Sequence, residues 1–274
     1  MRPMLLMLAC VSFLAVGCSK DVVRPNERLP VDSNVLIGLS ERLPERSLVL
    51  ACRTSREYGC FNYIIDTRLF QLPQSIRIDF NQVVAPVICA TAVGPARVEL
   101  DLGALGPGSA SLDLRGGTGG LTGRLDVSEG SYRVLVPQGG FRFDHRTLQR
   151  IPSRTVWGFF GYPRTDLEPA ARAVIGQMLA LGATPRRLAE GRYSVVLPNQ
   201  NRDTFKADAS GTIQYDGGHG YYHILPFALS FDGDLAALRE VVARTGRDFG
   251  DDLQLRVYTW QGDALYSWVL GRGQ

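Results

Sequence analysis

The sequence at residues 76–80 reads Ile-Arg-Ile-Asp-Phe, with apolar and polar side chains alternating at every position. Successive side chains of a β-strand point to opposite faces, so this period predicts a strand with one buried face. Residues 98–102 and 112–114 alternate in the same way. Glycine and proline in the segment 105–108, between those two runs, predict a tight turn.

The same pattern extends in both directions from this stretch. Apolar runs of strand length occupy residues 47–50 and 61–69, and further short runs follow at 125–127 and 132–136. Short strands with turn signals at intervals of roughly ten residues are typical of antiparallel sandwiches. We therefore predict an antiparallel β-sandwich domain over residues 46–150 that resembles the immunoglobulin fold.

The pattern changes near residue 151, where helical periodicity first appears. Strands are expected at 155–160, 193–198, 221–231 and 253–257, helices at 165–181 and 234–245, and a small hairpin at 205–214. This order resembles a ferredoxin-like βαββαβ unit over about residues 153–270. The predicted fold class is therefore α+β, with an α/β domain at residues 151–274. The resemblance is one of topology and carries no function.

The first 17 residues have the layout of a secretory signal. Arg2 precedes the apolar run 4–16, and a small residue, Gly17, precedes Cys18. The apolar run is shorter than the roughly 20 residues that a membrane-spanning helix needs. Because residues 14–18 read Leu-Ala-Val-Gly-Cys, the leader resembles a bacterial lipoprotein signal ending in a lipobox. The alternative is an ordinary cleaved signal peptide whose cysteine is incidental.

The lipoprotein resemblance implies that Cys18 becomes the mature N-terminus and carries acyl chains that anchor it in a membrane. It also implies, through Ser19, the outer membrane, and residues 19–21 resemble a tag for export to the cell surface. Residues 18–45 are expected to serve as the lipid anchor and tether, because the segment 24–32 is polar and contains two prolines.

Three further cysteines follow in the mature chain. Cys52 and Cys60 flank a polar segment that ends in Gly59, and we expect them to form a disulfide across a turn. Cys89 lies in an apolar run, which is typical of an inert buried thiol.

Composition argues against several classes of function. With 30 Lys and Arg against 27 Asp and Glu, the chain is nearly neutral and has no basic cluster, so no nucleic-acid partner is expected. No paired Cys-x-x-Cys, nucleotide loop or hydrolase elbow is present, and we expect neither a metal site nor a cofactor. His145 is expected to be a surface residue at the junction of the two domains.

The segment 216–223 is the one place where catalytic side chains could converge. It contains Asp216, His219 and His223 among several glycines. The two histidines would lie roughly 13 Å apart along a strand, so they could meet only if the glycines fold the loop back. The alternative is a glycine-rich entry to a hairpin.

The C-terminal hairpin supplies the candidate binding residues. A two-residue turn at Gly262 and Asp263 would place Arg256, Tyr258 and Trp260 on one face. Exposed aromatic rings with an arginine could bind a glycan or a protein partner. The alternative is that the β-sandwich packs on this face and buries it.

The resulting prediction is a lipid-anchored outer-membrane lipoprotein with a non-enzymatic role in binding or in the structure of the envelope. The alternative is a cell-envelope hydrolase with its site in the segment 216–223.

Overall fold

The computed structural model describes residues 26–32, 34–90, 92–117, 119–198, 202–215 and 220–271. Most of the regular structure lies in two sheets, and 52% of the described residues are in strands against 15% in helices. The larger sheet contains β1 (Arg28–Pro30), β2 (Val35–Arg42), β3 (Ser47–Tyr58), β4 (Ile64–Leu72), β5 (Ser75–Val84), β6 (Gly94–Ala104), β7 (Gly108–Gly116), β8 (Gly119–Val127), β9 (Ser131–Leu135), β10 (Phe141–Phe143), β11 (Thr147–Gln149), β14 (Gly191–Val196), β15 (Arg202–Ala207) and β16 (Ile213–Gln214).

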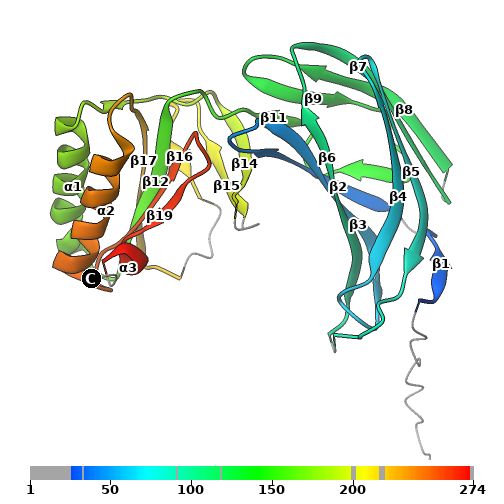
Figure 1. Cartoon of the computed structure of the whole chain (residues 1–274), viewed down its shortest axis with the longest axis horizontal. Helices are drawn as coiled ribbons and strands as arrows, with labels where there is room; N and C mark the ends of the chain where they lie inside the picture. The colour runs from blue at the N-terminus through cyan, green and yellow to red at the C-terminus, as the bar shows by residue number, and fades with distance from the viewer. Residues whose placement is uncertain are drawn as a thin grey trace, which may run out of the picture.

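The N-terminal strands of this sheet roll around a shared core (Figure 1). The order is β11-β9-β8-β7-β5-β4-β6-β3-β2, and β2 continues the sheet to β14, β15 and β16. A short segment joins the two edges of the roll, because β10 pairs with β2 and β11 pairs with β9. Inside, Ile76, Ile78 and Phe80 are buried, which confirms the alternation predicted for residues 76–80.

The immunoglobulin-like sandwich predicted for residues 46–150 is wrong. The sheet is mixed, since β5 pairs with β7 and β4 with β6 in parallel. A purely antiparallel sandwich cannot contain such pairs. The alternating residues were assigned correctly to strands, but alternation carries no information about which strand pairs with which.

The smaller sheet has the order β13-β17-β12-β18-β19 and is antiparallel throughout. Its strands are β12 (Thr155–Tyr162), β13 (Thr184–Pro185), β17 (His223–Ser230), β18 (Gln254–Thr259) and β19 (Ala264–Tyr266). The helices are η1 (Thr165–Leu167), α1 (Glu168–Ala180), α2 (Leu235–Phe249) and α3 (Ser267–Leu270). Helices α1 and α2 cover one face of this sheet, and β14, β15 and β16 cover the other (Figure 1).

The predicted ferredoxin-like βαββαβ unit is also wrong, and the reason is one strand. The second expected strand, β14, leaves the smaller sheet and pairs in parallel with β2 through Val195 and Val196. The place beyond β17, where that strand was expected, is taken by the two-residue β13, and β12 lies between β17 and β18. Because layers cover both of its faces, β12 is buried at all eight positions.

A buried carboxylate holds the two sheets together at the end of β2. Glu41 is 1% exposed, and its carboxylate accepts hydrogen bonds from Arg150 Nε at 3.2 Å and Arg46 Nε at 3.1 Å. It also accepts the backbone N–H of Ile151 at 3.0 Å. Glu41 therefore connects the rolled sheet to the start of the segment that enters β12.

Replacing Glu41 tests this connection. Glu41→Gln removes the negative charge and leaves the buried Arg150 without its counterion, which is expected to lower the free energy of unfolding by about 3–5 kcal/mol. Urea unfolding of the two proteins measures the difference. The matched control is Glu168→Gln on α1, an exposed partner of Arg172, for which about 0.5 kcal/mol or less is expected. Equal effects of the two substitutions would contradict a structural role for Glu41.

Candidate functional site

The predicted aromatic binding face at the C-terminal hairpin does not exist as an exposed surface. Tyr258 is 4% exposed, and its ring lies 5.7 Å from that of Trp157 in the core beneath β14, β15 and β16. Arg256 is half-buried over the ring of Phe159, and Trp260 packs against the core under the helices. The cover comes from β14–β16 and not from the rolled sheet.

The register of this hairpin also differs from the expected one. Arg256 pairs with Tyr266 and Tyr258 with Ala264, so the turn is centred on Gln261 and not between Gly262 and Asp263. The register therefore differs from the expected one by three residues. A shift by an odd number of residues exchanges the two faces of a strand, so Leu265 lies in the core with Val257.

The other predicted sites lie partly outside the described residues. Cys18, Asp216 and His219 fall outside them, whereas His223 begins β17 and stacks on Tyr162 with ring centroids 5.6 Å apart. Within the described ranges, no three His, Cys, Asp or Glu side chains gather as a metal site would require. No helix in the described part of the chain is long and apolar enough to cross a membrane.

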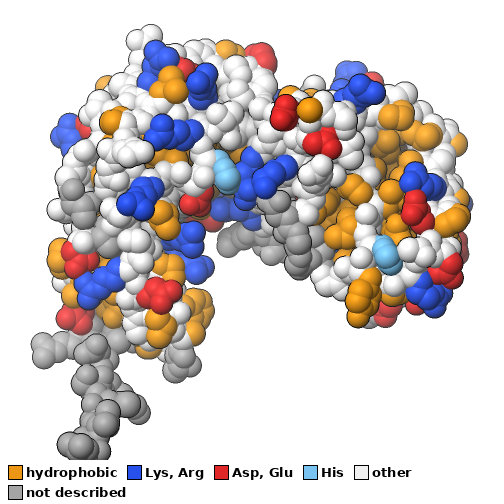
Figure 2. Space-filling model, turned by 180° about the vertical axis from the view of Figure 1, so that it is seen from behind, with side chains coloured by type: hydrophobic (Ala, Val, Ile, Leu, Met, Phe, Trp, Pro, Cys, Tyr) orange, Lys and Arg blue, Asp and Glu red, His pale blue; other side chains and the backbone are white. Residues whose placement is uncertain are grey.

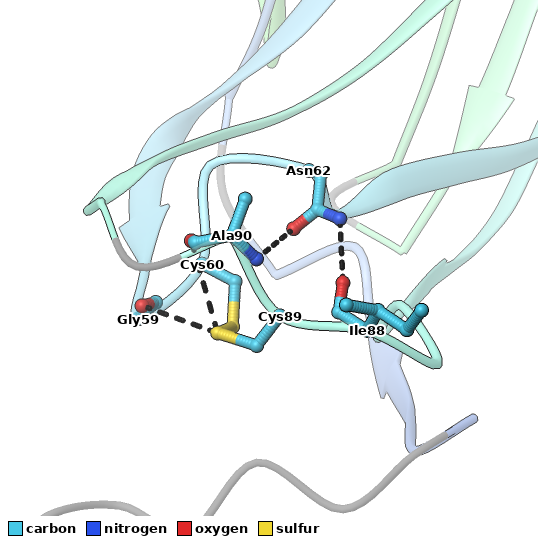
Figure 3. Close-up of a disulfide and its surroundings, with 6 residues drawn as sticks. All are labelled: Gly59, Cys60, Asn62, Ile88, Cys89 and Ala90. Atoms are coloured by element: carbon cyan, nitrogen blue, oxygen red, sulfur yellow. Dashed lines mark hydrogen bonds between the residues drawn. A yellow bond between two sulfur atoms is a disulfide. The ribbon is translucent and has the colours of Figure 1, made fainter.

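The disulfide joins different cysteines from those predicted. Cys60 pairs with Cys89 across 5.4 Å between Cα atoms, while Cys52 is free and buried (Figure 3). The predicted turn between Cys52 and Cys60 is strand as far as Tyr58, so about 20 Å of extended chain follows Cys52. That separation exceeds the span of a disulfide. Cys89 is therefore not the inert buried thiol that was predicted. The buried thiol is Cys52, and burial raises its pKa.

A polar cleft lies in the larger sheet, at the junction between its rolled strands and β14–β15. Strand β10 pairs with Val35–Ile37 and β14 with Glu41–Arg42, so the cleft opens over residues 38–40 of β2, between them. Its volume is about 360 Å³, and a second hollow of about 320 Å³ shares Gly38, Asp144 and Arg202 with it. Figure 2 shows Lys and Arg side chains gathered where the surface is hollowed between the two parts of the molecule.

Arginines dominate the walls of these two adjoining hollows, which together form the junction cleft. Arg192 and Arg202 line the first hollow, and Arg53, Arg97 and Arg202 line the second. Two carboxylates lie among them, Asp144 in both hollows and Glu99 in the second. Arg202 donates to Glu99 at 2.7 Å. His145 is exposed and lines the first hollow, which confirms its predicted place on the surface.

Two of these arginines lie side by side on neighbouring strands. Arg53 of β3 and Arg97 of β6 are direct partners in the antiparallel ladder. Like charges at directly opposed positions destabilise a sheet. An anion bound between the two guanidinium groups would offset that repulsion, so the pair favours a negatively charged ligand.

The inner wall of the cleft is made of hydroxyl groups that connect both parts of the large sheet. The Ser40 and Ser194 hydroxyl oxygens lie 2.8 Å apart, and Ser194 and Thr204 follow at 3.1 Å. This chain links β2 to β14 and β14 to β15. It can offer hydrogen bonds to a ligand while it holds the walls at a constant separation.

The cleft was not predicted from the sequence because the residues that line it are distant from one another in the chain. The four arginines come from four strands and form no local cluster. Part of a signal was present, since Arg97 occupies a polar position of the alternating run 96–102, whereas Arg53 lies in a continuous polar run. Their opposition depends on the register between β3 and β6, which a single sequence does not encode locally.

A buried acidic residue lies on the inner face of β15, close to Tyr258, one of the predicted binding residues. Asp203 of β15 is 5% exposed and accepts the indole N–H of Trp157 at 2.9 Å. Burial raises the pKa of Asp203 to about 6, although the Trp157 hydrogen bond favours the carboxylate. The same group contributes, with burial, to the raised pKa of Tyr258.

Comparison with protein-family models, curated proteins and solved structures finds no match to this chain. The junction cleft and the buried Asp203 are therefore the features on which a functional argument rests.

Asp203 is expected to make stability depend on pH. Because its folded-state pKa is raised to about 6, the protonated form favours folding; this contribution is complete below about pH 4 and is lost as the pH rises through about 6. Between pH 4 and 7 the free energy of unfolding of the wild type, relative to Asp203→Asn, should fall by up to about 3 kcal/mol. Denaturant unfolding at each pH measures it.

Asp208→Asn is the control of opposite sign. Hydrogen bonds from Ser210 and Thr212 lower the pKa of Asp208, so its contribution is present at neutral pH and is lost on acidification. A pH-independent difference between the wild type and Asp203→Asn would contradict the raised pKa.

Proposed function

We propose that the chain is a bacterial outer-membrane lipoprotein, anchored through acyl chains on Cys18, whose role is to bind and not to catalyse. The anchor is supported by the leader and its lipobox-like end at residues 14–18. Binding is supported by one observation above the others, the opposition of Arg53 and Arg97 in the wall of the junction cleft.

The ligand chemistry that fits the cleft is an anionic group, a carboxylate, phosphate or sulfate, carried by a glycan or a protein partner. Guanidinium groups bind such oxyanions through paired, charge-assisted hydrogen bonds. The hydroxyl groups of Ser40 and Ser194 contact each other, an arrangement suited to holding a ligand. A nucleophile would need an adjacent base at hydrogen-bond distance, and Ser40 and Ser194 instead hydrogen-bond to other hydroxyl groups.

The anchor is tested by metabolic labelling with a lipid precursor. Cys18→Ser should abolish the label on the protein and release it from the membrane fraction, because no other signal supplies the acyl chains. Cys10→Ser is the matched control, since it removes a cysteine from the same leader and should leave the label in place. Label that persists on Cys18→Ser would contradict the proposed anchor.

The cleft is tested by calorimetric titration with inorganic phosphate and sulfate. The double substitution Arg53→Gln with Arg97→Gln should weaken binding by at least about tenfold, because each charge-assisted hydrogen bond contributes about 1.5–3 kcal/mol. The same substitution should slightly stabilise the free protein, since it removes a like-charge pair.

Arg172→Gln, on the surface of α1, serves as the control and should change neither property appreciably. A double variant that folds normally and binds both anions as well as the wild type would contradict the anionic ligand. Anionic glycans and acidic peptides, titrated next, distinguish the two classes of partner.

A further inference from the structure

We propose that the protein inserts a rigid apolar tip into the lipid bilayer beside its anchor. The apolar tip consists of Phe61, Val87, Ile88 and Val93, from the β3–β4 and β5–β6 connections. The inference rests on the proposed lipid anchor and adds a second, structured contact with the membrane.

The tip exposes apolar side chains to an unusual extent. Ile88 is 80% exposed, Val87 69%, Val93 66% and Phe61 49%. Single apolar residues on a surface need no explanation, but several large ones on two adjacent loops mark an interaction site.

The two loops that carry the tip are held together covalently and by hydrogen bonds. The disulfide Cys60–Cys89 joins them directly. Asn62 then donates its side-chain N–H to the carbonyl of Ile88 at 2.8 Å and accepts the N–H of Ala90 at 3.1 Å (Figure 3). Two backbone groups of the tip, the carbonyl of Ile88 and the N–H of Ala90, are thereby satisfied within the protein, which lowers the cost of moving this loop into an apolar medium.

The apolar tip lies at the end of the molecule to which the anchor is attached. The N–H of Ala85 donates to the carbonyl of Glu27 at 2.9 Å, and β1 pairs with the last residues of β5. Ala85 precedes Val87 by two residues, so the described chain begins next to the tip.

The length of chain between anchor and fold keeps the tip close to the bilayer. Seven residues separate Cys18 from Asn26. Even fully extended, the eight Cα–Cα steps from Cys18 to Asn26 span at most about 29 Å, counting ~3.6 Å per step. An acylated Cys18 therefore holds the end of the molecule that carries the tip near the lipid headgroups, and the lipid bilayer is the apolar partner within reach.

The experiment uses the mature lipidated protein, carrying Ile88→Trp, in vesicles of phosphatidylethanolamine and phosphatidylglycerol with brominated acyl chains. Bromine quenches indoles that reach the acyl region. The fluorescence added by Ile88→Trp should shift to the blue and fall by about half or more, for a tip that enters ~5–10 Å into the interface. The wild type supplies the background of the three natural tryptophans.

Leu72→Trp is the matched control, because Leu72 is 69% exposed at the far end of β4 from the tip. Its added fluorescence should remain water-like and unquenched. Combining Val87→Asp with Ile88→Trp should restore water-like emission, because a charge opposes insertion.

The outcomes separate this proposal from the anchor. A lipidated protein, verified by mass spectrometry, whose Ile88→Trp fluorescence is unquenched or no more quenched than Leu72→Trp overturns the tip and leaves the anchor standing. A blue shift without quenching would place the tip against a protein or a second copy of the chain, and overturns it as well. A protein that carries no lipid overturns the anchor and this proposal together.

Discussion

The buried carboxylate of Glu41 is the constraint on which the arrangement of both sheets depends. A carboxylate that is 1% exposed must be neutralised by nearby cations, and Arg46 and Arg150 supply that neutralisation. Arg150 in turn donates to the carbonyl of Ser128, and Tyr132 donates to the carbonyl of Arg46. One charge therefore brings together β2, the β2–β3 turn, the β8–β9 turn and the entry to β12.

The pairing of β14 lies next to this convergence. Glu41 is also the residue of β2 that is opposite Val195 in the parallel ladder. The N–H of Ile151 holds the start of β12 at Glu41, and the strand that follows α1 and β13 pairs with β2 and not with the smaller sheet. The rolled sheet then gains three strands, and the smaller sheet gains a second covering layer whose aromatic side chains bury Trp157 and Tyr258.

The parts of this fold that sequence reasoning could predict are those determined by local periodicity. The alternation at residues 76–80 identifies β5 and its buried face, and Asp234 caps α2 by accepting the N–H of Ala236. The pairing of β14 with β2 is not local, since it joins residues more than 150 positions apart. The predicted disulfide pairing was wrong for the same reason. The short separation in sequence favoured Cys52 as the partner of Cys60, whereas the folded sheet brings Cys89 to Cys60. Arg53 was expected in a turn between Cys52 and Cys60, and the β3–β6 register places it on a strand opposite Arg97.

Strand β3 relates the junction cleft to the proposed membrane contact. Tyr58 at its end pairs with Gly94, and a Cβ atom at Gly94 would lie only 3.0 Å from the Cβ of Phe61. This end of β3 therefore lies at the apolar tip. Arg53 lies five residues back along the strand, about 17 Å at ~3.4 Å per residue, and Leu48, opposite Glu41, lies a further ~17 Å away. A tip at the headgroups therefore holds the cleft beyond the roughly 8 Å over which salt screens surface charge at physiological ionic strength. The arginines would then meet an anionic ligand free of competition from lipid phosphates, which is the physical reason for a rigid strand, rather than a flexible tether alone, between anchor and binding site.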